Sequence, residues 1–432
     1  MAAPSVKPTK SIAQLRAERA AATQGRVAPV VAAPPTDSVF RSVQRGEEPT
    51  VLTFTMTPTH VSYANTLRRT MITEVETIAF RANILPDGST ADVKITKNST
   101  PMSNEMLAHR IGLIPVHVAD PLNWNPDAYA FKLDLKNDSS DARDIVAGDI
   151  EVYKNRGPDE EPLKVPSVEF FHPDRVTQDT ALLAVLKGRI GAQEPEALAF
   201  TAKATMGTGR EHAAFMPVTS RCAYGYTRDD DPDRMREAFT HWLKTHKMLD
   251  AAAIQENSTK KAEFEREFKT MEVQRVFKVD ERGEPYSFDF IVESVGVLDP
   301  VYIVGRAIDI MIAKVLRYAS VDAGDLPEGL KVVPADARMK GYDFIFQGED
   351  HTLGNLLQTW MEQNQVDTEE ITFVGYKVPH PLRDEMVLRV AVASGLVADA
   401  RAAVAKAARE CATMFRNWAA AWAGSAPVVM KL

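Results

Sequence analysis

Residues that could carry acid–base or metal chemistry are few and scattered along this chain. Glu211 and His212 are adjacent and could serve as general acid and base, but the sequence places no nucleophile or metal cluster beside them. The acidic run 229–231 precedes a proline and has the pattern of a solvated turn. A zinc set would have to combine residues whose spacing fits no standard zinc pattern, namely His212, Cys222, His241 and His246. We therefore expect no catalytic residue, no cofactor and no metal site.

The composition is that of an ordinary globular protein. The 432 residues are 45% hydrophobic and 25% charged, which is enough for several domains with apolar cores. The net charge of -8 at pH 7 disfavours direct binding to a nucleic acid backbone, which usually requires an excess of Lys and Arg. Two cysteines predict no disulfide framework, and no apolar run approaches the roughly 18–20 residues that cross a bilayer. We expect a soluble, intracellular protein.

One helix stands out, in the stretch 350–361. Asp350 or Thr352 can accept hydrogen bonds from the unpaired N–H groups at its start. Its apolar side chains recur at helical spacing and form one stripe: Leu353, Leu356, Leu357, Trp360 and Met361. Such a stripe must be buried against another surface. The stretch 62–75 predicts a second amphipathic helix, with an apolar face made by Ala64, Leu67, Met71 and Val75.

These two stretches belong to an internal repeat. When Asn65 is placed on Asn355, apolar positions of the two helices coincide, Leu67 with Leu357 and Met71 with Met361. A second matching pair is formed by the strand-like stretches 288–294 and 387–394, each followed by a long helix. The offset falls from 290 residues at the first pair to 100 at the second. The first copy is therefore longer by about 190 residues, the size of an inserted domain.

The repeat divides the chain into parts. We predict a disordered tail at 1–45, a first copy at 46–97 and 286–320, an inserted and mostly β domain at 98–285, a linker at 321–338, and a compact second copy at 339–432. The long helices at 300–318 and 397–418 have apolar faces of their own, which include Ile308, Ile312 and Phe415.

Five motifs in chain order resemble one known family. They are the stretches 62–79, 107–115, 207–218, 350–357 and 375–382. Together they resemble the α-like subunits of multisubunit DNA-directed RNA polymerases, that is, the bacterial α amino-terminal domain, the archaeal D and L subunits, and the third-largest and eleventh subunits of eukaryotic polymerase II. The first copy is similar to the larger partner and the second copy to the smaller. Separate genes normally encode the two, and their fusion resembles the polymerases of large DNA viruses.

The resemblance implies an α+β chain with two dimerisation folds in tandem, each an antiparallel sheet with packed helices. It implies a non-catalytic scaffold subunit of a viral polymerase, whose two folds form an intramolecular heterodimer. The implied partners are the second-largest and largest polymerase subunits and a small subunit of the α-associated group, with nucleic acid bound only indirectly and no membrane. The implied location is the host cytoplasm or nucleus, with packaging in the virion left open. The alternatives are a free-standing adaptor with the duplicated fold and a hydrolase that uses Glu211 and His212.

The resemblance also suggests roles for individual residues. The predicted intramolecular interface consists of Ala64, Leu67, Met71, Leu353, Leu356, Leu357, Trp360, Met361, Ile308, Ile312 and Phe415. The predicted contacts to the large subunits are Arg68, Arg69, His109, Arg110, Gly112, Arg210, Glu211 and His212. For the charged members, a solvated surface or a local loop contact is the alternative. The cysteines that hold metal in the inserted domain of some relatives are missing here, so we expect this domain to be stabilised by packing alone.

Overall fold

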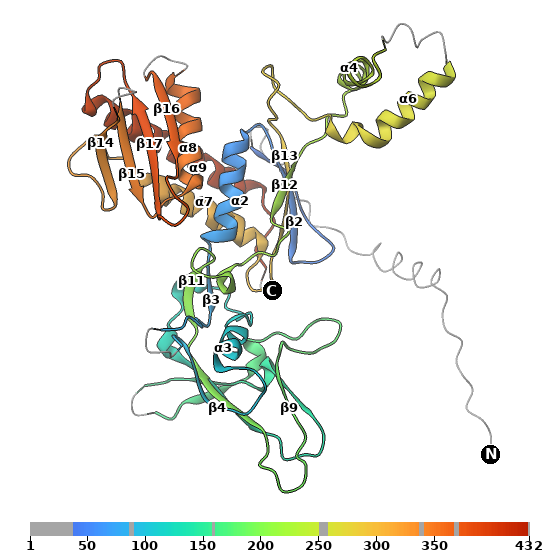
Figure 1. Cartoon of the computed structure of the whole chain (residues 1–432), viewed down its shortest axis with the longest axis vertical. Coiled ribbons are helices and arrows are strands. Elements are labelled where there is room, and N and C mark those ends of the chain that lie inside the picture. Colours follow the sequence, from blue (N-terminus) through green and yellow to red (C-terminus); the bar gives the residue numbers. More distant parts are fainter. Residues whose placement is uncertain are drawn as a thin grey trace.

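The computed structural model describes residues 38–85, 90–157, 160–249, 258–336, 341–366 and 371–430. Figure 1 shows two α+β units side by side, an inserted domain below them, and a helical hairpin that projects to one side. Most of the predicted tail, residues 1–37, lies outside the described residues. From residue 40 the tail prediction is wrong, because Phe40–Arg45 forms strand β1. This strand was missed because only Phe40 in it is fully buried and a bulge at Ser42 interrupts its alternation.

The first copy is a four-stranded antiparallel sheet with the order β1–β2–β13–β12. The remaining strands and the two helices that pack on it are β2 (Val51–Met56), β12 (Ala223–Tyr226), β13 (Phe288–Glu293), α2 (Val61–Thr73) and α7 (Pro300–Leu316). Alternate residues of β2 and β13 face the helices, as the period of a half-buried strand requires. Phe54 and Phe290 stack face to face in the middle of this sheet, with ring centroids 4.9 Å apart.

The second copy repeats this arrangement, with the sheet order β14–β15–β17–β16. Its elements are β14 (Leu330–Pro334), β15 (Tyr342–Gln347), α8 (His351–Met361), the π-helical turn η8 (Glu362–Val366), β16 (Phe373–Lys377), β17 (Glu385–Ala391) and α9 (Val397–Ser425). The helix predicted at 350–361 is confirmed, and its N-cap is Asp350, whose carboxylate accepts from the Thr352 N–H.

Strand β14 lies inside the predicted linker, so that prediction is wrong for residues 330–334. Its pairing extends the repeat by one strand. In the second copy Leu330 lies opposite Phe346, and in the first copy Phe40 lies opposite Met56. Each residue of the second-copy pair therefore follows its counterpart in the first-copy pair by 290 residues. The sequence hides this correspondence because cross-strand pairing is not visible in the pattern of one strand.

The inserted domain is built around a five-stranded antiparallel sheet with the order β4–β10–β5–β7–β8. Its strands are β4 (Val93–Asn98), β5 (Tyr129–Lys136), β7 (Glu151–Lys154), β8 (Leu163–Val165) and β10 (Ala197–Ala202), and β6 (Arg143–Val146) pairs with β9 (Leu182–Leu186). Helix α3 (Asn104–Gly112) packs beside β4. Short helical turns complete it: η1 Pro121–Asn123, η2 Pro126–Ala128, η3 Ala147–Asp149, η4 Ser167–Glu169 and η5 Ala213–Phe215.

Two boundaries of the inserted domain differ from the prediction. Strand β4 was assigned to the first copy but pairs inside the inserted sheet. Strand β12 was assigned to the inserted domain but pairs with β13 of the first copy. A ladder between β3 (Glu76–Ala79) and β11 (Thr205–Thr208) joins the two units. In each case the strand belongs to the unit that supplies its hydrogen-bonding partner, which the sequence does not reveal.

A helical hairpin fills the connection from β12 to β13. Helix α4 (Pro232–Trp242) continues into the π-helical turn η6 (Leu243–Lys247), and α6 (Ser258–Met271) returns and ends in η7 (Val273–Arg275). Asp231 of the acidic run caps α4 by accepting from the Asp233 N–H. The hairpin has a small apolar cluster of its own, made of Trp242, Leu243 and Phe268.

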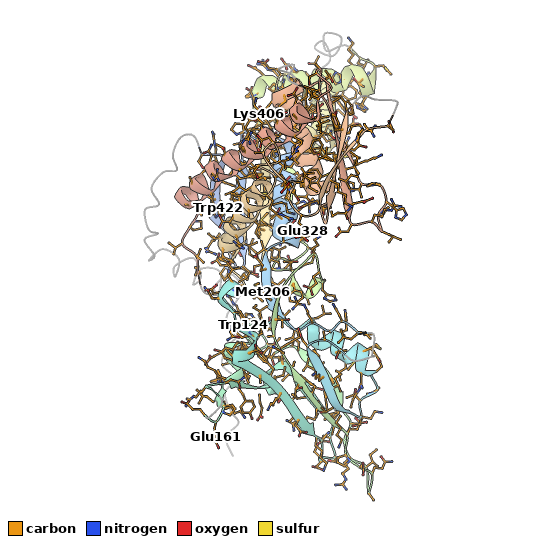
Figure 2. All side chains as sticks on the ribbon, turned by 90° about the vertical axis from the view of Figure 1, so that its left-hand side faces the viewer. Trp124, Glu161, Met206, Glu328, Lys406 and Trp422 are labelled. Carbon is orange, nitrogen blue, oxygen red and sulfur yellow. The ribbon has the colours of Figure 1, made fainter. Side chains whose placement is uncertain are left out.

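The apolar core shows how these units are related. One continuous cluster contains buried side chains from both copies, whereas the inserted domain has a separate cluster. Met206 and Trp124 lie where the inserted domain joins, below helix α9, which carries both Trp422 and Lys406 (Figure 2). The two ends of the shared unit also meet, because the hydroxyl oxygens of Ser38 and Ser425 lie 3.1 Å apart. The two copies therefore form one folded body.

Candidate functional site

The contact between the two copies is built first from the short helices α2 and α8. All eleven residues of the predicted interface lie in the shared cluster or pack against it; nine are buried, and Trp360 and Ile312 are partly buried. Polar bonds fix the register at the edge of this contact. The Tyr63 hydroxyl donates to Gln363 Oε1 at 2.9 Å, and the hydroxyls of Thr359 and Ser62 lie 2.9 Å apart.

The long helices α7 and α9 pack against each other and also reach across to the opposite sheet. Trp422 of α9 meets Phe40 and Phe54 of the first sheet, with ring centroids 4.9 and 5.4 Å apart. In return, Tyr318 just after α7 packs edge-on against Phe346 of the second sheet at 4.9 Å. Each large side chain buried in this way stabilises the contact by roughly 1.5–3 kcal/mol. Neither sheet is fully covered without the helix of the other copy.

A buried ionic cluster also joins the copies. The carboxylate of Glu349, which precedes α8, is only 4% exposed and lies 3.3 Å from Lys314 Nζ of α7. Lys314 also pairs with Glu74 at the end of α2, and the Tyr318 hydroxyl donates to Glu349 Oε1 at 3.2 Å. Burial raises the pKa of the Glu349 carboxyl, since one ammonium group shared between two carboxylates does not fully offset the loss of water. The sequence reasoning missed this cluster, whose members are distant in the chain.

Arg69 was predicted to contact a large polymerase subunit, but it points at the second copy. Its Nε donates to Thr352 Oγ1 at 2.7 Å, and its Nη2 lies 3.0 Å from Asp350 Oδ2. Burial alone would raise the pKa of the Asp350 carboxyl, but hydrogen bonds from Thr352 and the charge of Arg69 lower it below its usual value. Arg69 therefore binds the capped start of α8 and belongs to the contact between the copies.

The motifs 107–115 and 207–218 meet where the inserted domain joins the first copy. The rings of His109 and His212 lie 5.6 Å apart. Glu211 accepts two hydrogen bonds from Arg81, at 2.5 and 2.9 Å, and these hold the pKa of its carboxyl below the usual range. His212 Nδ1 accepts from the Ala214 N–H at 3.1 Å. Both side chains that could have served a hydrolase are thus engaged in local structure.

Three further predicted contact residues also have partners inside the chain. Arg210 lies 2.9 Å from Asp384 of the second copy, and Arg110 donates to the Leu182 carbonyl at 3.0 Å. Gly112 is buried, and a Cβ placed on it would lie 2.9 Å from the Phe80 carbonyl oxygen. Their local contacts give these residues structural roles, while the exposed side chain of His109 remains open to solvent.

Arg68 differs from its neighbour. Its Nε donates to Asn65 Oδ1 at 3.0 Å, and no carboxylate pairs with it among the residues that the structure describes. Its half-buried side chain lines a shallow groove of about 410 Å³ between α2 and β12, together with Asn65, Ala223, Tyr224, Gly225 and Tyr226. Of the two adjacent arginines, only Arg68 is placed to bind a carboxylate from outside the chain.

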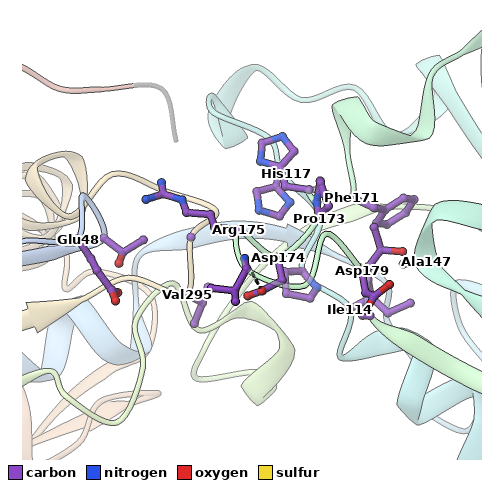
Figure 3. A pocket seen from close by; sticks show the side chains of 17 residues that line it. Glu48, Ile114, His117, Ala147, Phe171, Pro173, Asp174, Arg175, Asp179 and Val295 are labelled. Atoms are coloured by element: carbon purple, nitrogen blue, oxygen red, sulfur yellow. Dashed lines mark hydrogen bonds between the residues drawn. The ribbon is translucent and has the colours of Figure 1, made fainter. Parts of the chain in front are cut away.

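A cleft of about 520 Å³ lies between the inserted domain and the first copy (Figure 3). Glu48 and Val295 line one side, and Arg175 and the stacked rings of His117 and His172 line the other, with ring centroids 3.8 Å apart. Burial lowers the pKa of His117 to about 4, and the neighbouring His172 contributes to this. His117 is therefore neutral near pH 7 and packs as an aromatic ring.

Among the residues that the structure describes, no group of three or more His, Cys, Asp or Glu side chains is arranged to hold a metal ion. Within the same ranges, no helix has both the length and the apolar character needed to cross a bilayer.

Comparison with known families identifies the paired folds. Residues 53–315 match the RNA polymerase Rpb3/Rpb11 dimerisation domain, and residues 342–419 match a second family of the same description. The first match alone spans more than half of the chain. The chain belongs to the RNA polymerase Rpb3/Rpb11 dimerisation family. Its fold is therefore α+β, with two Rpb3/Rpb11-type dimerisation domains in tandem.

Individual relatives agree with this family. Over 209 residues, 45% of this chain, it is 27% identical to the DNA-directed RNA polymerase subunit Rpo3 of Thermoplasma volcanium, of which the match covers 66%. It is 25% identical over 279 residues to Rpo3 of Pyrococcus horikoshii, covering 62% of this chain and 92% of that subunit. It is 26% identical over 298 residues to the human DNA-directed RNA polymerases I and III subunit RPAC1, covering 62% and 80%.

Proposed function

We propose that this chain is a non-catalytic assembly subunit of a multisubunit DNA-directed RNA polymerase, in which the two dimerisation domains of one chain pair with each other. The observation that carries the proposal is the apolar cluster shared by both copies, in which α2 packs on α8 and each long helix reaches the opposite sheet. The names of the Rpo3 and RPAC1 relatives support a place in a polymerase.

The paired domains would serve as a platform on which the second-largest and largest subunits assemble, with a small subunit of the α-associated group as a further partner. Nucleic acid would be reached only through the complex, in keeping with the net charge of -8. The fused order of the two domains resembles that of the polymerases of large DNA viruses, and we therefore propose the host cytoplasm or nucleus as the location of the complex. We assign β1 and β12 to the first domain and β14 to the second, which revises the boundaries expected from the sequence.

Fusion would fix the stoichiometry of the two domains. Only residues 317–329 separate α7 from β14, and Arg401 of α9 donates to the Val321 and Gly324 carbonyls in this connection at 2.6 and 2.7 Å. A short connection holds the second domain at an effective concentration on the order of millimolar relative to the first. The domains would then pair within each chain without a search for a separately made partner.

Affinity purification of the tagged chain from producing cells tests this function. We expect the two large polymerase subunits to be recovered in equal amounts with it, and their absence would refute the proposal. Arg68→Glu should reduce that recovery at least tenfold, because it replaces a groove cation that can bind a carboxylate with a repelling charge. Arg41→Glu, on the exposed face of β1, is the matched control and should leave recovery and folding unchanged.

A further inference from the structure

The edges of the two dimerisation sheets are not protected equally. Three of the four edge strands have a feature that blocks pairing with another strand. Strand β1 has a bulge at Ser42, where φ is +51°. On β14, Pro334 lacks an N–H, and the Leu330 N–H is bonded to the Pro327 carbonyl. On β16, the Tyr376 N–H donates to Gln358 Oε1 of α8 at 3.0 Å. Such features are how proteins prevent unwanted strand addition.

Strand β12 has no such feature. The Thr227 N–H donates to the Ser287 carbonyl at 3.0 Å, and Gly225 lies opposite Asp289 in the same register. In an antiparallel ladder the bonded residues alternate, so the N–H and C=O groups of Tyr224 and Tyr226 point away from β13. Within the described part of the chain, neither of these N–H groups has an acceptor. An open edge of this kind is a template for one more strand.

The surroundings of this edge indicate what would bind there. Gly225 has no atom within 4 Å of the position of a Cβ, so the face of β12 at this residue is open. The groove beside the edge contains Arg68, whose side chain, within the described residues, donates a hydrogen bond only to Asn65. A residue directly across from β12 on this face would place its Cβ about 5 Å away, within reach of the guanidinium group. A carboxylate is the complementary partner for an unpaired arginine.

We infer that β12 receives an added strand from a large polymerase subunit, an extended segment whose carboxylate side chain pairs with Arg68. The inference rests on the proposed function and deepens it, since it names the mode of binding. The main-chain bonds to Tyr224 and Tyr226 supply affinity without regard to sequence, and the ion pair with Arg68 fixes the register of the added strand. The sheet of the first domain would then have five strands in the assembled complex.

Amide hydrogen exchange, measured on the full chain alone and in the complex recovered from producing cells, tests the inference. We expect the amides of Tyr224 and Tyr226 to exchange rapidly in the free chain and at least tenfold more slowly in the complex. The amides of Gly225 and Thr227, which already face β13, should be slow in both and serve as internal controls.

A matched pair of variants gives a second measurement. Tyr226→Pro removes an N–H that points outward, so it breaks no bond to β13, but it denies that donor to an added strand. Tyr226→Thr loses the same ring contacts and keeps the N–H. We expect Tyr226→Pro to weaken assembly roughly tenfold or more relative to Tyr226→Thr, at similar thermal stability.

The possible outcomes distinguish a failure of the strand-addition inference from a failure of the proposed assembly function. If the complex forms while the two edge amides remain unprotected, or if both variants assemble equally, the inference is wrong and the assembly function stands. Protection that depends on the concentration of the free chain would show that two copies of this chain pair through β12, and would also overturn it. If no large subunit is recovered with the wild-type chain, both the function and the inference fail.

Discussion

Helix α7 of the first copy has 17 residues, whereas α9, its counterpart in the second copy, has 29. The additional turns of α9 carry Trp418 and Trp422 across β1 and β2 of the first sheet. From the first copy, Tyr318 in the turn that follows α7 packs against Phe346 of the second sheet. Two copies of one fold thus contribute unequally to their contact, and the compact copy provides more of the cover.

The inserted segments and the exposed sheet edge, in contrast, belong mainly to the first copy. The first copy carries both the inserted domain and the α4–α6 hairpin, and it has the unprotected edge β12, whereas the edges of the second copy are protected. This difference indicates that the two copies have different roles. The second copy completes the shared apolar core, and the first copy carries the exposed surfaces that other proteins could bind. Substitutions in each copy should reveal this difference between the copies.

Leu357→Asp should separate the two copies. Leu357 is completely buried in the shared cluster, and a charge placed there has no partner, a change that costs several kcal/mol. We expect a larger hydrodynamic radius by light scattering and loss of the cooperative thermal transition. Leu382→Asp is the matched control, because Leu382 is 89% exposed in the second copy. An unchanged radius and Tm for Leu357→Asp would contradict the shared core.

Truncating the aromatic side chains should reveal the asymmetry of the contact. Trp422→Ala removes the contacts with Phe40 and Phe54 and the bond to the Val301 carbonyl, and should lower the free energy of unfolding by about 3–5 kcal/mol. Tyr318→Ala removes the contact with Phe346 and the bond to Glu349 and should lower it by less, about 2–3 kcal/mol. Denaturant titration of both variants measures the difference. Equal losses would show that α9 does not dominate the contact.

Glu349→Gln should increase stability above neutral pH. The pKa of the Glu349 carboxyl is higher in the folded chain than in the unfolded chain. The contribution of this carboxyl to the free energy of unfolding is therefore fully present below the unfolded-state pKa and is lost as pH rises through the folded-state pKa. A neutral amide avoids that loss, so the variant should gain about 1 kcal/mol over wild type at pH 8 and less at pH 5. Tm at the two pH values tests this, with the exposed Glu47→Gln as control. A Tm loss that grows with pH would contradict it.

Local periodicity was sufficient to predict the helices of the contact. The stripes from Ala64 to Met71 and from Leu353 to Met361 follow helical spacing, and that spacing also revealed the repeat. The strands β1, β12 and β14 were missed or assigned to the wrong unit because their identity depends on a partner distant in the chain. A polar strand such as β1 has no strong pattern of its own.

The polar contacts were predictable only by residue type. Arginine at positions 68 and 69 suggested recognition of carboxylates, and both residues are placed for that chemistry. The sequence could not show that Arg69 reaches Asp350 inside the chain, since a turn of one residue on a helix changes the direction of a side chain by about 100°. Glu349 and Lys314 gave no signal because each is unremarkable until the fold places it beside the other.

The contact between Ser38 and Ser425 has a consequence for the order of the two domains along the gene. Arg45, at the end of β1, also donates to the Val428 carbonyl, so β1 lies along the end of α9 and the segment after it. A short bridge across this point, with an opening in the connection 317–329, would give a circularly permuted chain with the second domain first and with the same contacts. The order seen here is therefore one of two that the same folded body accommodates, and the contacts between the domains do not select between them.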